Sequence, residues 1–409
     1  MEAIKSKVIA YQAVLFPVFD TLLNGVNSIF HIYISWYLTT DQYGILNALF
    51  AFLALLMVTG ITIQIYTAKQ VADPKWEDRS YEELKHFGLR FIVFLGIVIL
   101  FMIPLLMRGL RTDIGAVLIV SFIFGTNFMV SLNRGIMQGK KAFIQLNLSF
   151  YIEVLTKILW LVIFLPIFKN IYVALFGLFV GMLLALWHSD YVLRHICEET
   201  VKGREAGKKS AMKILRALTA IFMANFFLYY FTSINMMMVN YYLPDQSGIY
   251  AVSAKYSQVF VHVGFSVITV LIPLVSSYKS DFKRYKSEVI KYLLLFFGAG
   301  VIGLILYRTF IPQTIYYIFD KRYHDASAYV FMEGIAFYFL ILSYLLISMD
   351  IVQDRNGYVP ILGMAAVAIT LGIYLNHNHL IQMIWVEIWV YMGLFSILMV
   401  RFLKRSEIK

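Results

Sequence analysis

Twelve long apolar segments follow one another along this chain and constrain its fold more than any other feature. A helix that crosses a bilayer needs about 20 mostly apolar residues, because the hydrocarbon core is about 30 Å thick. Inside the bilayer every backbone polar group needs an internal partner, so such segments fold as helices. The sequence therefore predicts an all-α polytopic membrane protein. The expected spans lie near residues 10–38, 45–67, 88–107, 114–134, 143–167, 171–193, 213–240, 248–276, 289–310, 325–350, 358–375 and 380–402.

The composition excludes several other classes of protein. Of the 409 residues, 60% are hydrophobic and only 14% are charged, whereas soluble domains carry about 25% charged residues. The net charge of +11 does not indicate a nucleic-acid partner, because Lys and Arg fall in short loops between the apolar segments. No P-loop and no Cys/His metal cluster is visible, so neither ATP hydrolysis nor a metal site is expected. Cys197 is the only cysteine.

The distribution of Lys and Arg predicts the topology. If the N-terminus is cytoplasmic, 27 of the 35 basic residues lie on the cytoplasmic side of the expected spans and only 6 on the other side. Cytoplasmic loops of membrane proteins carry such an excess of positive charge. We therefore expect both termini to lie in the cytoplasm.

A short repeat indicates that the chain is two copies of one helical unit. The pentapeptide from Asp41 to Ile45 (DQYGI) recurs as Asp245 to Ile249 (DQSGI), 204 positions later, and each copy is expected in the turn after the first span of its half. Internal duplication is typical of transporters. Six spans in each half give both halves the same orientation. We predict an N-terminal lobe over residues 1–194, a cytoplasmic inter-lobe linker over 195–212 and a C-terminal lobe over 213–409.

Four motifs carry a resemblance to a known family. They are the Tyr43-Gly44 pair, Gly248 to Ala251, Asn133 to Gly139, and Ile318 to Tyr323 followed by Ala326 and Ala328. With them the chain resembles the multidrug/oligosaccharidyl-lipid/polysaccharide flippase superfamily, and within it the polysaccharide transporters that flip O-antigen or capsule precursors. Asp320 stands where that family usually has Gly.

The resemblance implies a fold and a function. It implies two six-helix lobes around a central cavity that opens alternately to either side, with the first, second, seventh and eighth helices lining the cavity. The implied cargo is a polyprenyl-pyrophosphate-linked oligosaccharide, moved from the cytoplasmic to the outer leaflet of a bacterial or archaeal cytoplasmic membrane. Glycosyltransferases and a glycan polymerase are the implied partners, besides the membrane lipids.

Polar side chains recur at helical spacing in two of the expected spans. Such side chains are costly at membrane depth unless they face protein or water, and steps of three and four residues place them on one helix face. We interpret both faces as walls of the cavity, and a weaker polar face in the seventh span adds Asn225. The residues are Asp20, Asn24, Asn27 and His31 in the first span, and Lys255, Gln258 and His262 in the eighth.

The chemistry of these residues predicts their roles. The Lys255 ammonium suits a pyrophosphate, although an ion pair with Asp20 is an alternative. The Asp20 carboxylate suits a coupling Na⁺ or H⁺. Hydrogen bonding between helices is the alternative role for Asn24 and Asn27, and simple packing is the alternative for the two histidines.

Four further charged residues lie within the fifth, tenth and twelfth spans. Glu153 and Lys157 are four residues apart in the favourable order for a helical ion pair, so we expect a structural ion pair, with a substrate contact as the alternative. Glu333 and Glu387 receive no role from the sequence.

The sequence therefore predicts a flippase for a lipid-linked oligosaccharide, driven by an ion gradient or the membrane potential, and not an enzyme. A cation-coupled multidrug exporter of the same superfamily is the main alternative, which Lys255 disfavours and Asp20 does not. A membrane polymerase or glycosyltransferase usually needs a sizeable outward loop, and the outward loops here are short. A major-facilitator transporter also has twelve spans, but residues 67–86 lack the Gly-rich basic signature of that class.

Overall fold

The expected all-α fold is confirmed over the part of the chain that can be described. The computed structural model describes residues 26, 29–72, 80–197, 211–276, 278, 281–353, 355 and 357–404, and within these residues it contains α-helices and one short 3₁₀ turn, η1 (Lys321–Tyr323), without strands. The helices are α2 (Thr40–Val71), α3 (Ser80–Leu110), α4 (Ile114–Gly139), α5 (Phe143–Phe168), α6 (Ile171–Cys197), α7 (Ala211–Tyr242), α8 (Pro244–Ser276), α9 (Phe282–Ile318), α10 (Ala326–Val352), α11 (Val359–Leu375) and α12 (Leu380–Leu403).

The helices correspond to the expected spans in number and order. The second to twelfth expected spans each fall in one of α2 to α12, and the described part of the first span is helical at residues 29–37. Eight of the described helices are long and apolar enough to cross a bilayer, and α11 is a shorter apolar helix. Several helices are longer than the apolar segment within them. α9, for example, extends the expected span 289–310 at both ends, because a helix continues past the hydrocarbon where charged residues reach the interface.

The described helices form two compact units. The first unit comprises Met1–Tyr229 and the second Tyr230–Lys409, so the division falls within α7. Of the linker expected at 195–212, residues 195–197 end α6, residues 211 and 212 begin α7, and residues 198–210 lie outside the described part. The linker and the lobe boundaries therefore stay predictions.

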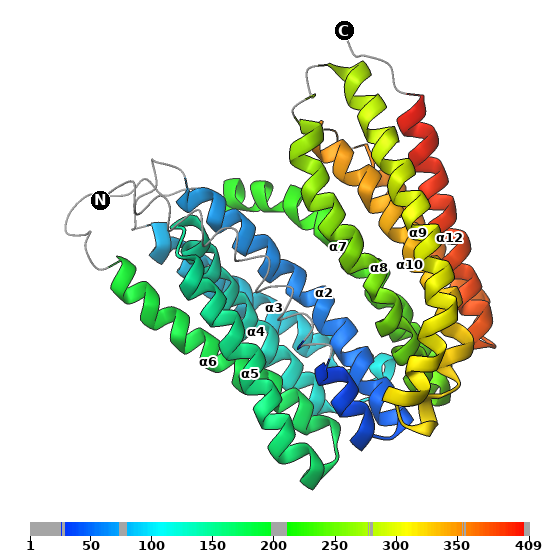
Figure 1. Cartoon of the computed structure of the whole chain (residues 1–409). Coiled ribbons are helices and arrows are strands. Elements are labelled where there is room, and N and C mark those ends of the chain that lie inside the picture. The colour runs from blue at the N-terminus through cyan, green and yellow to red at the C-terminus, as the bar shows by residue number, and fades with distance from the viewer. Residues whose placement is uncertain are drawn as a thin grey trace. The chain divides into compact units, whose positions relative to one another are not determined.

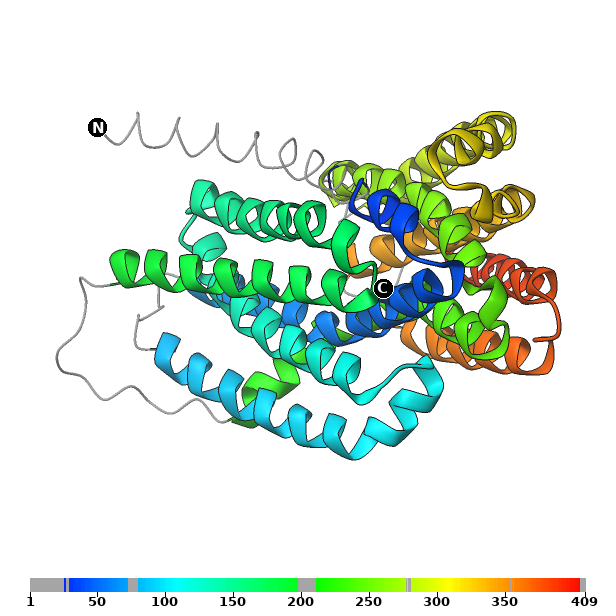
Figure 2. The ribbon, with the colours of Figure 1, turned by 90° about the horizontal axis from the view of Figure 1, so that it is seen from below.

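The pattern of helix neighbours repeats six helices later. In the first unit α2 packs on α4, α3 on α4, α4 on α6, and α5 on α6 (Figure 1). In the second unit α8 packs on α10, α9 on α10, α10 on α12, and α11 on α12. Within the first unit, α3 and α4 run antiparallel beside each other (Figure 2). The same architecture is therefore built twice, as the repeated pentapeptide indicates.

The repeated pentapeptide opens a helix in each unit and does not lie in the turn where the sequence placed it. Thr39 caps α2, because its hydroxyl accepts a hydrogen bond from the backbone N–H of Gln42 at 3.2 Å. The Gln42 side chain accepts in turn from the backbone N–H of Thr39 at 3.2 Å. This reciprocal capping box starts the helix at Thr40. In the second unit Pro244 starts α8, and the Ser247 hydroxyl donates to its carbonyl at 2.6 Å.

Glycines bring the helices of the first unit into close contact. A Cβ atom on Gly135 of α4 would lie 2.6 Å from the carbonyl oxygen of Gln64 on α2, and one on Gly139 would lie 2.8 Å from that of Ala68. On α6, a Cβ atom on Gly181 would lie 2.5 Å from the carbonyl oxygen of Glu153. Small residues four apart let membrane helices approach until their backbones touch. The glycines of the Asn133–Gly139 motif thus have a packing role between α2 and α4.

Candidate functional site

The polar residues of the eighth span lie on the side of α8 opposite its buried serines. Ser253, Ser257 and Val261 are buried on one side of the helix, and the Ser257 hydroxyl lies 3.0 Å from the Tyr307 hydroxyl of α9. By contrast, Lys255 and Gln258 are half-buried and His262 is exposed. A membrane helix with one face packed and a cation on another is expected where a water-filled path runs past it.

The polar residues of the first span are only partly described. Asp20, Asn24 and Asn27 lie outside the described residues. His31 is half-buried, with its ring edge-to-face against Phe30 at 5.2 Å and against Phe50 of α2 at 5.7 Å between centroids. Asn225 is half-buried on α7. The structure therefore shows where His31 packs, and the role of this polar face stays a prediction.

A buried arginine holds α4 to α5. Arg134, the last residue of the fourth expected span, is 3% exposed and lies within α4. Its guanidinium donates to the Glu153 carboxylate at 2.8 Å, to the Ser149 hydroxyl at 3.1 Å and to the Ser149 carbonyl at 3.0 Å. It also stacks over the Phe150 ring at 3.8 Å. Such a planar, multiply bonded guanidinium offsets the free energy of burying its charge.

The predicted partner of Glu153 was Lys157, and the structure adds Arg134 as a partner. Lys157 is 6% exposed, and its ammonium lies 4.6 Å above the Phe30 ring. A cation over an aromatic face is stabilised by the ring quadrupole, the more so where water is excluded. Glu153 is thus bound to Arg134 and also lies one helical turn before Lys157, and its pairing with Lys157 stays a prediction. The sequence did not predict the bond between Arg134 and Glu153, because α4 extends five residues beyond the expected span 114–134.

The same end of the first unit carries a second polar link, between α4 and α6. The Asn133 amide donates to the Asp190 carboxylate at 2.7 Å and to the Ser189 hydroxyl at 3.0 Å. Asn133 and Arg134 are neighbours in the sequence and bind α6 and α5 respectively. Together they make α4 the central helix of a polar network, which is how buried polar groups satisfy one another in a bundle.

The second unit contains two fully buried carboxyl groups to which the sequence gave no role. Glu333 of α10 and Glu387 of α12 are both 0% exposed. The Tyr250 hydroxyl donates to Glu387 Oε1 at 3.0 Å. Within the described residues, both carboxyl oxygens of Glu333 and Oε2 of Glu387 are buried without a hydrogen-bond partner. Burying an unpaired carboxylate is costly, so such groups are expected to hold a proton or a cation.

A tyrosine and an amide close this cluster on the side of α7. The Asn235 amide donates to the Tyr391 hydroxyl at 3.1 Å, and that hydroxyl donates to the Phe231 carbonyl at 2.7 Å. All three residues are buried. The carboxyl groups therefore lie among α7, α8, α10 and α12 in the interior of one unit. The sequence does not predict this cluster, because its residues come from helices that are far apart in the chain.

Comparison with known proteins gives the family. A family model described as polysaccharide biosynthesis protein matches residues 14–279. The chain belongs to this family. The match confirms the resemblance that the sequence motifs carry. No curated protein matches the chain.

Solved structures confirm the fold of this family member. The chain superposes on an inward-facing multidrug resistance MATE family transporter of the MOP superfamily with a TM-score of 0.74 and 13% identity, covering 92% of each chain. It superposes on the lipid II flippase MurJ in an inward closed conformation with a TM-score of 0.72 and 15% identity, covering 95% of this chain and 87% of MurJ. A MOP superfamily transporter from Pyrococcus furiosus gives 0.60 and 12% identity, covering 97% and 96%. The polysaccharide biosynthesis family member is thus a multi-pass membrane protein with the fold of the MOP superfamily.

Proposed function

We propose that this protein is a flippase that moves a polyprenyl-pyrophosphate-linked oligosaccharide from the cytoplasmic to the outer leaflet of the cytoplasmic membrane. A large polar head group cannot cross hydrocarbon unaided, whereas the polyprenyl chain is already soluble there. The observation that carries the proposal is that Lys255, Gln258 and His262 share one face of α8, away from its buried Ser253 and Ser257. Membership in a polysaccharide biosynthesis family supports this cargo.

Lys255 is the residue that we assign to the pyrophosphate. An ammonium binds phosphate oxygens as a point charge, and Gln258 and His262 on the same helix face supply further hydrogen-bonding groups for sugar hydroxyls. The protein acts as a secondary transporter in this proposal, without a chemical reaction of its own. Glycosyltransferases that build the cargo and a polymerase that consumes it are its expected neighbours.

Ion coupling is part of the proposal. Asp20 is one candidate for H⁺ or Na⁺ binding, from its place on the polar face of the first span. The buried Glu333 and Glu387 are a second candidate, because two carboxyl groups in a dry interior cannot both be charged without a cation beside them.

The proposal also places both termini in the cytoplasm. Labelling of a cysteine introduced at Gly203, in a Cys197→Ala background, tests this topology. Labelling from outside the cell would invert the topology.

The experiment that tests the cargo is ligand-dependent thermal stabilisation of the purified protein in lipid. A ligand that binds only the folded state raises the unfolding temperature. We expect a polyprenyl-pyrophosphate sugar to stabilise the wild type and the control Lys291→Ala, which removes an exposed lysine of α9, more than Lys255→Ala. Stabilisation by cationic drugs alone, independent of Lys255, would assign the protein to the drug exporters.

A further inference from the structure

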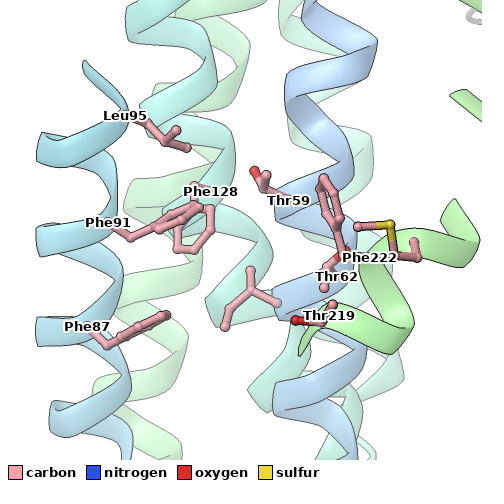
Figure 3. A pocket seen from close by; sticks show the side chains of 10 residues that line it. Thr59, Thr62, Phe87, Phe91, Leu95, Phe128, Thr219 and Phe222 are labelled. Carbon is pink, nitrogen blue, oxygen red and sulfur yellow. The ribbon is translucent and has the colours of Figure 1, made fainter. Parts of the chain in front are cut away.

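A cavity of about 320 Å³ lies within the first unit among α2, α3, α4 and the beginning of α7 (Figure 3). Phe87 and Phe91 reach it from α3, Phe128 from α4 and Phe222 from α7, and Thr59 and Thr62 reach it from α2. This volume is at the lower end of the range of small-molecule sites, about 300–1,000 Å³. The described lining of the cavity includes no residue of α8 and neither of the buried carboxyl groups.

The walls of the cavity are suited to an apolar ligand. The Phe87 and Phe91 rings stack with centroids 6.2 Å apart, and the Phe91 and Phe128 centroids are 5.2 Å apart. The Thr59 hydroxyl donates to the Leu56 carbonyl at 2.8 Å, and the Thr62 hydroxyl donates to the Val58 carbonyl at 2.7 Å. These two hydroxyl groups are therefore satisfied by their own helix and need no polar partner from a ligand. A polar molecule would lose hydrogen bonds to water on entering and gain few.

Two exposed cations lie beside the cavity. Lys69 is seven residues after Thr62 on α2, so it lies on nearly the same helix face and about 10 Å further along the axis. Arg90 directly precedes Phe91 on α3, and both basic residues are exposed. Positive charge at this end of α2 and α3 is also what the predicted cytoplasmic side of the membrane requires. Along α2 the side chains thus change from apolar to cationic over about two helical turns, whereas Arg90 lies at the level of Phe87 and Phe91 on α3.

We propose that this cavity binds part of the isoprenoid chain of the lipid-linked cargo at the cytoplasmic leaflet, with the pyrophosphate near Lys69 and Arg90. The inference rests on the proposed function and adds to it a site for the lipid tail. Two cations match the charge of a pyrophosphate better than that of a single phosphodiester, which favours the cargo over a bilayer phospholipid. The tail is thus held in the first unit before the head group enters the transport path.

A filling variant tests this site in the full-length protein in lipid nanodiscs. The probe is a polyprenyl pyrophosphate with a photoreactive diazirine on its chain, and the readout is labelling of the peptide that contains Phe87 and Phe91. Thr59→Phe places a ring in the cavity. Its control, Ile65→Phe, adds the same ring at a position of α2 that is 41% exposed. We expect labelling to fall about tenfold or more in Thr59→Phe and to stay at the wild-type level in Ile65→Phe.

A second variant keeps the test decisive if Thr59→Phe does not fold. Phe91→Ala removes the central wall of the cavity, and we expect weaker labelling in it too. Undiminished labelling in the folded variants overturns the proposal. Competition by phosphatidylglycerol as strong as that by unlabelled polyprenyl pyrophosphate also overturns it and assigns the cavity to a bilayer lipid.

The outcome for the cavity is distinguishable from the outcome for the proposed function. If the lipid-linked sugar stabilises the wild type through Lys255 but the cavity is not labelled, the proposed function is supported and the proposed site for the isoprenoid chain is wrong. If no lipid-linked sugar stabilises the wild type, the proposed function itself fails. Replacing Lys69 and Arg90 by Gln should weaken binding of polyprenyl pyrophosphate and leave binding of the uncharged polyprenol unchanged.

Discussion

Arg134 of α4 and Glu153 of α5 form a buried ion pair, with 2.8 Å between guanidinium nitrogen and carboxylate oxygen. The side chains are only 4% and 14% exposed. The pair joins two helices that are consecutive in the chain, and Ser149 and Phe150 complete the surroundings of the guanidinium. The charge of Arg134 is therefore part of the packing of the first unit and not of its surface.

Removing one partner of this pair should destabilise the first unit. Glu153→Gln leaves a buried guanidinium without its counterion, for which we expect a loss of about 3–5 kcal/mol. The double variant Arg134→Met/Glu153→Gln should lose less than the sum of the single variants, because neither charge is then left alone. Thermal unfolding in lipid measures all three.

The exposed pair of Arg322 and Asp320 provides the control for this prediction. Its atoms are 3.0 Å apart, but the side chains are 39% and 42% exposed. Arg322→Gln should therefore cost at most about 1 kcal/mol. Equal losses at both pairs would contradict the role assigned to burial.

Gly135→Ala should force α2 and α4 apart. The added methyl group would lie 2.6 Å from the Gln64 carbonyl oxygen and 2.8 Å from Thr67 Cβ. Because the first of these atoms belongs to a helix backbone, a rotamer change cannot relieve the contact, and overpacking of this kind costs about 1–3 kcal/mol. Gly96→Ala on α3 is the matched control, since no atom lies within 4 Å of its added methyl group. We expect unchanged or slightly higher stability for Gly96→Ala, and an equal loss in both variants would refute the packing role of Gly135.

Glu333→Gln and Glu387→Gln should uncouple transport from the ion gradient if the buried carboxyl pair takes part in coupling. Both side chains are 0% exposed, and a neutral amide of similar size avoids leaving a charge in the interior. We expect the variants to fold and to move cargo in proteoliposomes at a rate that no longer responds to an imposed pH or Na⁺ gradient. Glu288→Gln on α9, whose partner Lys291 is 3.8 Å away at the surface, is the control. A response that survives in both variants but disappears in Asp20→Asn would place coupling in the first span.

The hydrogen bond between Tyr172 and Asp113, which caps the beginning of α4, should make the stability of the protein depend on pH. The Tyr172 hydroxyl donates to the Asp113 carboxylate and is the main cause that lowers the pKa of Asp113, with the backbone N–H of Ala116 contributing. A lowered folded-state pKa stabilises the protein above the unfolded-state pKa, near 4, and this contribution is lost as the pH falls through the folded-state pKa.

Tyr172→Phe removes the main hydrogen bond to Asp113, so the folded-state pKa of Asp113 should move up toward its ordinary value. The difference in unfolding temperature between wild type and Tyr172→Phe should be largest above about pH 4 and should shrink as the pH falls below it. Unfolding scans between about pH 3 and pH 7 measure this difference. Tyr317→Phe, at a side chain that is 88% exposed, should show no such dependence. A difference that is constant over the whole pH range would contradict the assigned cause.

Some features of this protein were determined by the sequence alone because they depend on local composition. An apolar segment of about 20 residues must become a helix in a bilayer, whatever its neighbours are. The number and order of the helices therefore followed from the chain, as did the resemblance to the family that the comparison confirms. The repeat of the pentapeptide indicated duplication, which the repeated helix neighbours then displayed.

The tertiary structure alone decided which polar side chains meet. Arg134 stands at the last position of the fourth expected span, and only the structure shows that α4 continues to Gly139 and brings its side chain against Glu153. Glu333 and Glu387, 54 positions apart, share one interior with Tyr250 only because α8, α10 and α12 pack together. The aromatic cavity likewise needs residues from four helices. Hydrophobicity acts on each segment by itself, whereas ion pairs, hydrogen bonds and cavities depend on distances of a few ångströms between segments, which only the packing of the helices determines.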